Sequence, residues 1–204
     1  MNPVIYSITS PRLVLRCYHL NDVSALNSTI NANLGHLRQF MPWARVDHVT
    51  PEAHLELITR WIHDFEQAKD FVFAITDRKA GTLLGGTGLH KRAGEHGLEI
   101  GYWLAADACG KGIATEATAA LTRVAFDHYE MDRVEIHCSS MNHASARIPQ
   151  KLGFELEATL RRRYIDEYGV ADRMMFVLFR SNYPNASTPQ MDVRAFDDEG
   201  RQYL

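Results

Sequence analysis

The feature that most constrains the fold is a stretch in which an apolar strand, a small-residue loop and a long helix follow one another. The strand pattern covers 98–104, the loop carries Cys-Gly-Lys-Gly at 109–112, and apolar residues then recur at helical spacing as far as His128. Small residues leave N–H groups uncovered at the start of a helix, where roughly half a positive charge collects. The pattern therefore favours a site for a phosphate or diphosphate group, although two glycines before a helix are also typical of an ordinary turn.

Two familiar nucleotide motifs do not fit this loop. It lacks the Walker pattern G-x-x-x-x-G-K-[ST] and the dinucleotide pattern G-x-G-x-x-G, and the glycine-rich segment 85–88 matches neither. Nucleoside triphosphate and nicotinamide dinucleotide binding are therefore disfavoured.

Composition excludes several functional classes. The chain has 204 residues, 46% hydrophobic and 23% charged, which is typical of one soluble globular domain. A net charge of −3 gives no general attraction to nucleic acid or to an anionic membrane, and we expect neither as a direct partner. Three scattered cysteines (Cys17, Cys109, Cys138) and the lack of a signal or membrane-spanning run predict a cytoplasmic location. No Cys-x-x-Cys or His-x-x-x-His pair is available for a metal site.

The order of elements predicts an α/β domain over residues 1–181. Strand patterns lie at 12–16, 71–75, 83–86, 98–104, 133–138, 154–162 and 172–180, with helices between 21 and 69, after the glycine loop and after Asn142. In the last of these helices Pro149 lacks an N–H, so the carbonyl of Ser145 is expected to lose its helical partner. Residues 182–204 are rich in polar residues and are expected to form a mobile tail.

Three segments then fall into one register: Glu99–Leu104, Gly110–Ala117 and Asn142–Phe154. Together they resemble the GNAT acetyltransferase superfamily, specifically its RimJ/RimL-like ribosomal-protein N-acetyltransferase branch, over about residues 10–180. The resemblance implies an α/β (α+β) GNAT fold, with a mixed, strongly bent sheet of about seven strands flanked by about four helices. It also implies a central gap that holds the pantetheine arm of acetyl-CoA.

The same resemblance implies where this co-substrate binds. The residues concerned are Trp103, Leu104, Gly110, Lys111, Gly112, Ile113, Ala114, Thr115 and Asn142. Cys109 departs from the family pattern, which has Gln or Arg there, so a somewhat reduced affinity is expected. Its thiol either has a lowered pKa at the helix start or is an ordinary loop thiol.

For catalysis, the resemblance implies that Ser145 lies close to the CoA sulfur and acts as general acid, although a serine at a helix start also bonds its own backbone. A backbone N–H near a bulge in 99–104, where Gly101 is suitable, would polarise the carbonyl. Glu99, acting through water, is the candidate base, and a purely structural carboxylate is the alternative. His90 and Tyr164 are weaker candidates, and the glutamate that some relatives carry after this helix is missing from 160–164.

The predicted function is acetyl-CoA-dependent N-acetyl transfer to a primary amine, directly within a ternary complex. At pH 7 an α-amine with a pKa near ~8 is about a tenth neutral, whereas a lysine near ~10.4 is almost wholly charged, so a weak base favours a protein N-terminal α-amine. Two alternatives stay open: a non-catalytic CoA-binding regulatory module, and acetylation of a small-molecule amine such as an antibiotic. The loops 34–50, with Trp43, and 160–172 are expected to select the acceptor. Monomer and homodimer are both compatible with the sequence.

Overall fold

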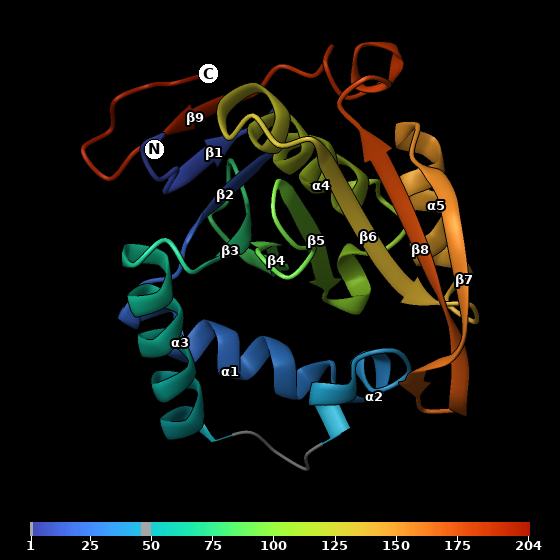
Figure 1. Ribbon diagram of the computed structural model, residues 1–204. Helices are drawn as coiled ribbons and strands as arrows, with labels where there is room; N and C mark the ends of the chain where they lie inside the picture. The colour runs from blue at the N-terminus through green and yellow to red at the C-terminus, as the bar shows by residue number, and fades with distance from the viewer. Residues whose placement is uncertain (1, 46–49) are drawn as a thin grey trace.

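One sheet of nine strands forms the centre of the protein in the computed structural model, which describes residues 2–45 and 50–204 (Figure 1). The strands are β1 (Ser7–Thr9), β2 (Leu13–Cys17), β3 (Asp70–Asp77), β4 (Leu83–His90), β5 (Gly97–Leu104), β6 (Arg133–Ser139), β7 (Glu155–Asp166), β8 (Gly169–Phe179) and β9 (Arg194–Phe196). Their order across the sheet is β7-β8-β6-β5-β4-β3-β2-β1-β9. All neighbours are antiparallel except β5 and β6, which run parallel.

Helices cover both faces of this sheet. They are α1 (Val23–Ala32), α2 (Leu34–Leu37), α3 (Pro51–Glu66), α4 (Ile113–Arg123) and α5 (His143–Leu152). The apolar residues of α1 and most of those of α3 pack in one cluster with Ala74 and Trp103. Those of α4 and α5 pack in a second cluster with Ile100 and Ile136, which Phe65 of α3 also joins. Because side chains alternate across a strand, β3, β4 and β5 contribute to both clusters.

The helix caps follow from residue type, because Thr and Asn are common at helix starts and Gly at helix ends. Thr50 accepts a hydrogen bond from Ala53 N (3.2 Å) at the start of α3, and Asn142 accepts one from Ser145 N (3.0 Å) at the start of α5. Gly153 ends α5 in the left-handed conformation (φ +87°). The helix after the glycine loop differs from prediction in one respect, because its last turn, Val124–His128, is a wider π-turn.

The sheet parts at its only parallel junction within the described residues. β5 and β6 pair only where Gly97–Glu99 lies beside Arg133–Glu135, although β5 continues to Leu104 and β6 to Ser139. Beyond this point β5 stays paired with β4, and β6 stays paired with β8. A gap therefore opens towards the carboxyl ends of β5 and β6, as the resemblance implied.

The sheet is larger than the seven strands predicted. The two additional strands, β1 and β9, have three residues each and pair with one another at the far edge (Figure 1). The segment 182–204 was expected to lie outside the domain, but it contributes β9 and buries Ala195 against the core. Pairing with β1 satisfies backbone groups that a free tail would leave to water. No helix in the described ranges is long and apolar enough to cross a bilayer.

Candidate active site

The glycine loop lies at the open end of the gap and follows β5 after one short 3-10 turn, Ala106–Ala108. Gly110 and Gly112 have φ values of +73° and +76°, a backbone conformation that glycine adopts without steric cost. The first backbone bond of this turn runs from Glu116 N to Gly112 O (3.0 Å), so the preceding N–H groups at the start of α4 lack an intrahelical acceptor. The structure thus has the uncovered helix start that the sequence predicts, beside Lys111 and Thr115.

The candidate catalytic residues lie on opposite faces of the sheet at the gap. On β5, Glu99 and Trp103 point to the face covered by α1 and α3, whereas Tyr102 and Leu104 point to the face covered by α4 and α5. Ser145, in the first turn of α5, is on the latter face. The structure therefore does not bring Ser145 and Glu99 onto one surface but places them on either side of the opening between β5 and β6.

Ser145 is held by Tyr102, a residue that the sequence analysis did not single out. The Tyr102 hydroxyl lies 3.0 Å from Ser145 Oγ and donates to the Ser145 carbonyl at 3.3 Å. This carbonyl is the one expected to lose its helical partner because of Pro149 inside α5. Burial raises the pKa of Tyr102 well above its ordinary value, although its hydrogen bond with Ser145 acts in the opposite direction. Tyr102 therefore keeps its proton throughout the physiological range.

Glu99 is part of a network of charged side chains at the point where the strands part. The residue is 8% exposed, and its carboxylate accepts two hydrogen bonds from Arg92, at 2.8 and 2.7 Å. His137 on β6 lies 3.4 Å from Glu99 and 3.0 Å from Glu135, the neighbour of Glu99 in the parallel register. Burial acts to raise the pKa of Glu99, but the Arg92 bond, with His137, outweighs it, and the pKa lies below the ordinary value. Glu99 is therefore an ionised but weak base.

The two other candidate bases have structural partners. His90 Nδ1 lies 2.8 Å from an Asp70 carboxylate oxygen, and the Tyr164 hydroxyl donates to the Phe40 carbonyl at 2.9 Å. The predicted bulge at Gly101 is wrong, because β4 and β5 keep one register from His90–Glu99 to Gly85–Leu104. Gly101 instead leaves room for His90, since a Cβ there would lie 3.3 Å from His90 Nε2.

The cysteines near the site are not activated. Cys109 is exposed, and its sulfur lies 3.5 Å from His36 Nε2. Partial desolvation and the Asp107 carboxylate raise the pKa of the Cys109 thiol, which contradicts the lowered value considered above and favours an ordinary loop thiol. Burial raises the pKa of Cys138, near Ser145, to about 11.

The segments expected to select an acceptor meet on the Glu99 face. The β7–β8 turn contacts the chain after α2, where Glu167 N donates to Gln39 O (3.1 Å). Trp43 is 44% exposed, and its ring lies edge-on to Trp103 with centroids 5.9 Å apart. A hollow of about 440 Å³ lies at this junction beside Ile165. Residues 46–49, also expected to contribute, lie outside the described part of the chain.

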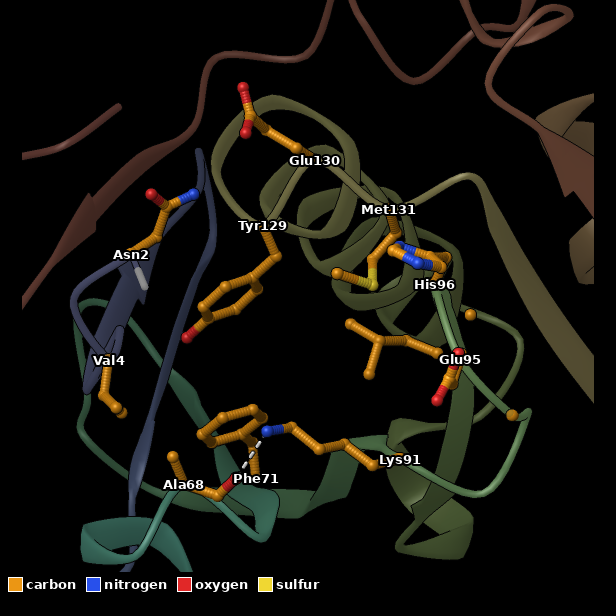
Figure 2. Close-up of a pocket in the computed structure, with 13 residues that line it drawn as sticks. Asn2, Val4, Ala68, Phe71, Lys91, Glu95, His96, Tyr129, Glu130 and Met131 are labelled. Carbon is orange, nitrogen blue, oxygen red and sulfur yellow. Dashed lines mark hydrogen bonds between the residues drawn. The ribbon is translucent and has the colours of Figure 1, made fainter.

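A larger cavity of about 750 Å³ lies near the other end of β5, and none of the predicted site residues lines it. Figure 2 shows Phe71, Tyr129 and Met131 around this cavity, with Lys91 reaching towards Phe71. The Lys91 ammonium donates to the Ala68 carbonyl (2.5 Å) and lies 5.4 Å from the centroid of the Phe71 ring. Its charge is thus already engaged by the protein. Within the described residues, no three His, Cys, Asp or Glu side chains gather as a metal site would need.

Comparison with known proteins agrees with this geometry. Residues 12–155 match the acetyltransferase (GNAT) domain. The chain is 41% identical over 63 residues to the putative ribosomal N-acetyltransferase YdaF of Bacillus subtilis (strain 168), a match that spans 31% of this chain and 34% of that protein. It is 29% identical over 132 residues to the probable N-acetyltransferase YjcK of the same organism, spanning 64% of this chain and 73% of that one.

Two solved structures share the fold. Mycobacterium smegmatis RimJ, in complex with CoA-disulfide, superposes with a TM-score of 0.80 at 21% identity, covering 93% of this chain and 95% of RimJ. The microcin self-immunity acetyltransferase MccE, in complex with acetyl-CoA and AMP, superposes with a TM-score of 0.76 at 23% identity, covering 83% and 93%. Since the matched domain spans well over half of the residues, the chain belongs to the GNAT acetyltransferase family.

Proposed function

We propose that the protein is an acetyl-CoA-dependent N-acetyltransferase that acetylates a protein N-terminal α-amine by direct transfer in a ternary complex. The observation that carries the proposal is the gap between β5 and β6, which has Ser145 on one face, Glu99 on the other and the uncovered start of α4 at its open end. The RimJ and MccE structures, which hold CoA-disulfide and acetyl-CoA, support the choice of donor.

The chain offers groups suited to each part of this donor. The uncovered N–H groups from Gly110 to Thr115 suit its diphosphate, and the exposed Lys111 adds a positive charge beside them. The edge of β5 at Trp103 and Leu104 has no strand partner on the β6 side, so it can bond the amides of an extended pantetheine arm. Asn142 caps α5 and is expected to add a polar contact. Bound there, acetyl-CoA supplies an acetyl group activated as a thioester.

Ser145 and Glu99 each carry one of the two proton transfers. Ser145 Oγ, fixed by Tyr102, is placed to give a proton to the departing sulfur from the α5 face. Glu99, through water, accepts the proton of the amine from the opposite face. Donor and acceptor thus reach the gap from opposite sides, which suits direct transfer.

The weakness of Glu99 as a base supports an α-amine over a lysine side chain. Its lowered pKa provides little drive to deprotonate an amine, so an acceptor that is already partly neutral reacts faster. At pH 7 the neutral fraction of an α-amine exceeds that of a lysine roughly 200-fold, for pKa values near ~8 and ~10.4.

The test is the release of CoA thiol from acetyl-CoA with three acceptors at equal concentration. These are a peptide with a free N-terminus and no lysine, an N-terminally blocked peptide with one lysine, and an aminoglycoside. We expect the first to react fastest, and Ser145→Ala to lower kcat by a factor of about 100 or more. Faster reaction of the blocked peptide or the aminoglycoside would refute the α-amine assignment. CoA binding without amine-dependent release would favour the regulatory module.

A further inference from the structure

An ion pair from a distant part of the chain lies beneath the glycine loop. Glu116, in the first turn of α4, is 7% exposed and bonds to the segment that leads into β2. Its Oε1 accepts from Ser10 Oγ (2.7 Å) and from Arg12 N (2.8 Å), and its Oε2 accepts from Arg12 Nε (2.6 Å). A carboxylate at a helix start competes with a bound anion for the positive end of the helix. Here the guanidinium and two further donors offset that charge.

The same guanidinium also holds the loop backbone. Arg12 Nη1 donates to the carbonyl oxygen of Lys111 at 2.9 Å. In a trans peptide the carbonyl and the following N–H point in opposite directions, and no cis peptide occurs in the described residues. With the Lys111 carbonyl turned towards Arg12, the N–H of Gly112 is turned away from it.

Gly112 fits this arrangement in two ways. Its φ of +76° is one that side chains rarely adopt, and a Cβ there would lie 3.4 Å from Arg12 Nη2. The Arg12 backbone is itself fixed, because its carbonyl accepts from Arg78 N (2.8 Å) at the edge of β3. The orientation of the 111–112 peptide is therefore set by the sheet and not by the loop alone.

We propose that Arg12, bonded to both Glu116 and Lys111, is a positioning residue that presets the loop backbone for the diphosphate of the acetyl donor. This rests on the proposed function. The role gains weight because Cys109 stands where the family pattern has Gln or Arg, so the loop depends more on the orientation of its own N–H groups.

The test compares two donors in the wild type and in Arg12→Lys, which keeps the charge but cannot bond Glu116 and Lys111 in the same planar geometry. Acetyl-CoA carries the diphosphate, whereas S-acetylpantetheine lacks it. We expect the variant to weaken CoA binding by calorimetry about tenfold, the equivalent of one charge-assisted hydrogen bond. We also expect kcat/KM with S-acetylpantetheine to stay within about twofold of the wild type. The matched control is Arg123→Lys, at the other end of α4, which pairs with Asp127 at 3.0 Å and should change neither donor.

Equal losses with both donors would show that Arg12 is merely structural, and unchanged CoA binding in Arg12→Lys would show that it is dispensable; either overturns the inference. If the wild type neither binds CoA nor transfers acetyl from either donor, the proposed function fails instead. The S-acetylpantetheine arm also reports whether the variant is folded.

Discussion

The contact between Tyr102 and Ser145 leads to a prediction about two variants, in which stability and catalysis are expected to respond differently. Tyr102→Phe removes the hydroxyl that lies 3.0 Å from Ser145 Oγ and 3.3 Å from the Ser145 carbonyl. A lost neutral hydrogen bond costs about 1 kcal/mol, and a partly buried carbonyl left without a donor costs about 1 kcal/mol more. For a chain of 204 residues the total of about 2 kcal/mol corresponds to a fall in Tm of about 4–8 °C.

Pro149 supplies the matched variant for a double-mutant cycle. Pro149→Ala restores an N–H four residues after Ser145, which can then donate to the Ser145 carbonyl as in a regular helix. In the Tyr102→Phe background it should therefore recover about 1 kcal/mol relative to its effect in the wild type, or about 2–4 °C in Tm. It cannot replace the bond from Tyr102 to Ser145 Oγ. Tyr102→Phe is expected to lower kcat, because Ser145 is the proposed general acid, and kcat should stay low in the double variant.

Thermal unfolding of the four proteins, with kcat measured for each, provides the readout. Additive changes in Tm would show that the two residues do not share the Ser145 carbonyl, and the reasoning would be refuted. Recovery of kcat together with Tm would show that Tyr102 acts on the helix alone and not on the serine hydroxyl. The Pro149→Ala single variant measures the loss of proline packing that the cycle subtracts.

Four further outcomes are expected. Arg92 and His137 hold the pKa of Glu99 below its ordinary value, so the carboxylate stays ionised above pH 5. For an α-amine peptide, kcat/KM should therefore rise with pH only as the amine deprotonates near ~8. An inflection between pH 5 and 7 that disappears in Glu99→Gln would contradict this. By the same shift, the stabilisation from Glu99 is present above its unfolded pKa and declines as acid protonates it, so the Tm difference between wild type and Glu99→Gln should shrink below about pH 4. Cys109→Arg should tighten CoA binding about fivefold by calorimetry, since it adds a cation beside the loop; unchanged affinity would mean that the loop backbone suffices. Removing 194–204 deletes β9 and exposes the edge of β1. The truncated protein should therefore melt at a lower temperature and aggregate more readily, as measured by light scattering. An unchanged Tm would argue against β9 as part of the core sheet.

Local sequence signals were sufficient for much of this structure. Caps and helix ends depend on residues within a few positions of each other, so Asn142 and Gly153 could be assigned from sequence alone. The freed Ser145 carbonyl was predictable from Pro149 in the same way, but its partner Tyr102 is 43 residues away. The seven longer strands have enough residues to show alternation or an apolar run.

What could not be predicted depends on contacts between distant segments. β1 and β9 have three residues each, too few for a periodic pattern, and they meet across nearly the whole chain. The bond between Arg12 and Glu116 joins positions 104 apart, and neither residue carries a local signal of that pairing. The Glu99 network has the same origin, because the parallel register of β5 with β6 brings Glu135 and His137 beside it. The π-turn after α4 was missed because its residues keep helical apolar spacing.

The short junction between β5 and β6 has a consequence for amide hydrogen exchange. Only Gly97–Glu99 pairs with Arg133–Glu135, so the two parts of the sheet are linked there by one short parallel strand pairing. Past Glu99, the β5 amides that face β6 have no strand to shield them and should exchange with deuterated solvent much faster than those that face β4. A rod-shaped ligand lying in the opening would slow these amides selectively, so their exchange rates alone would report whether the protein is loaded.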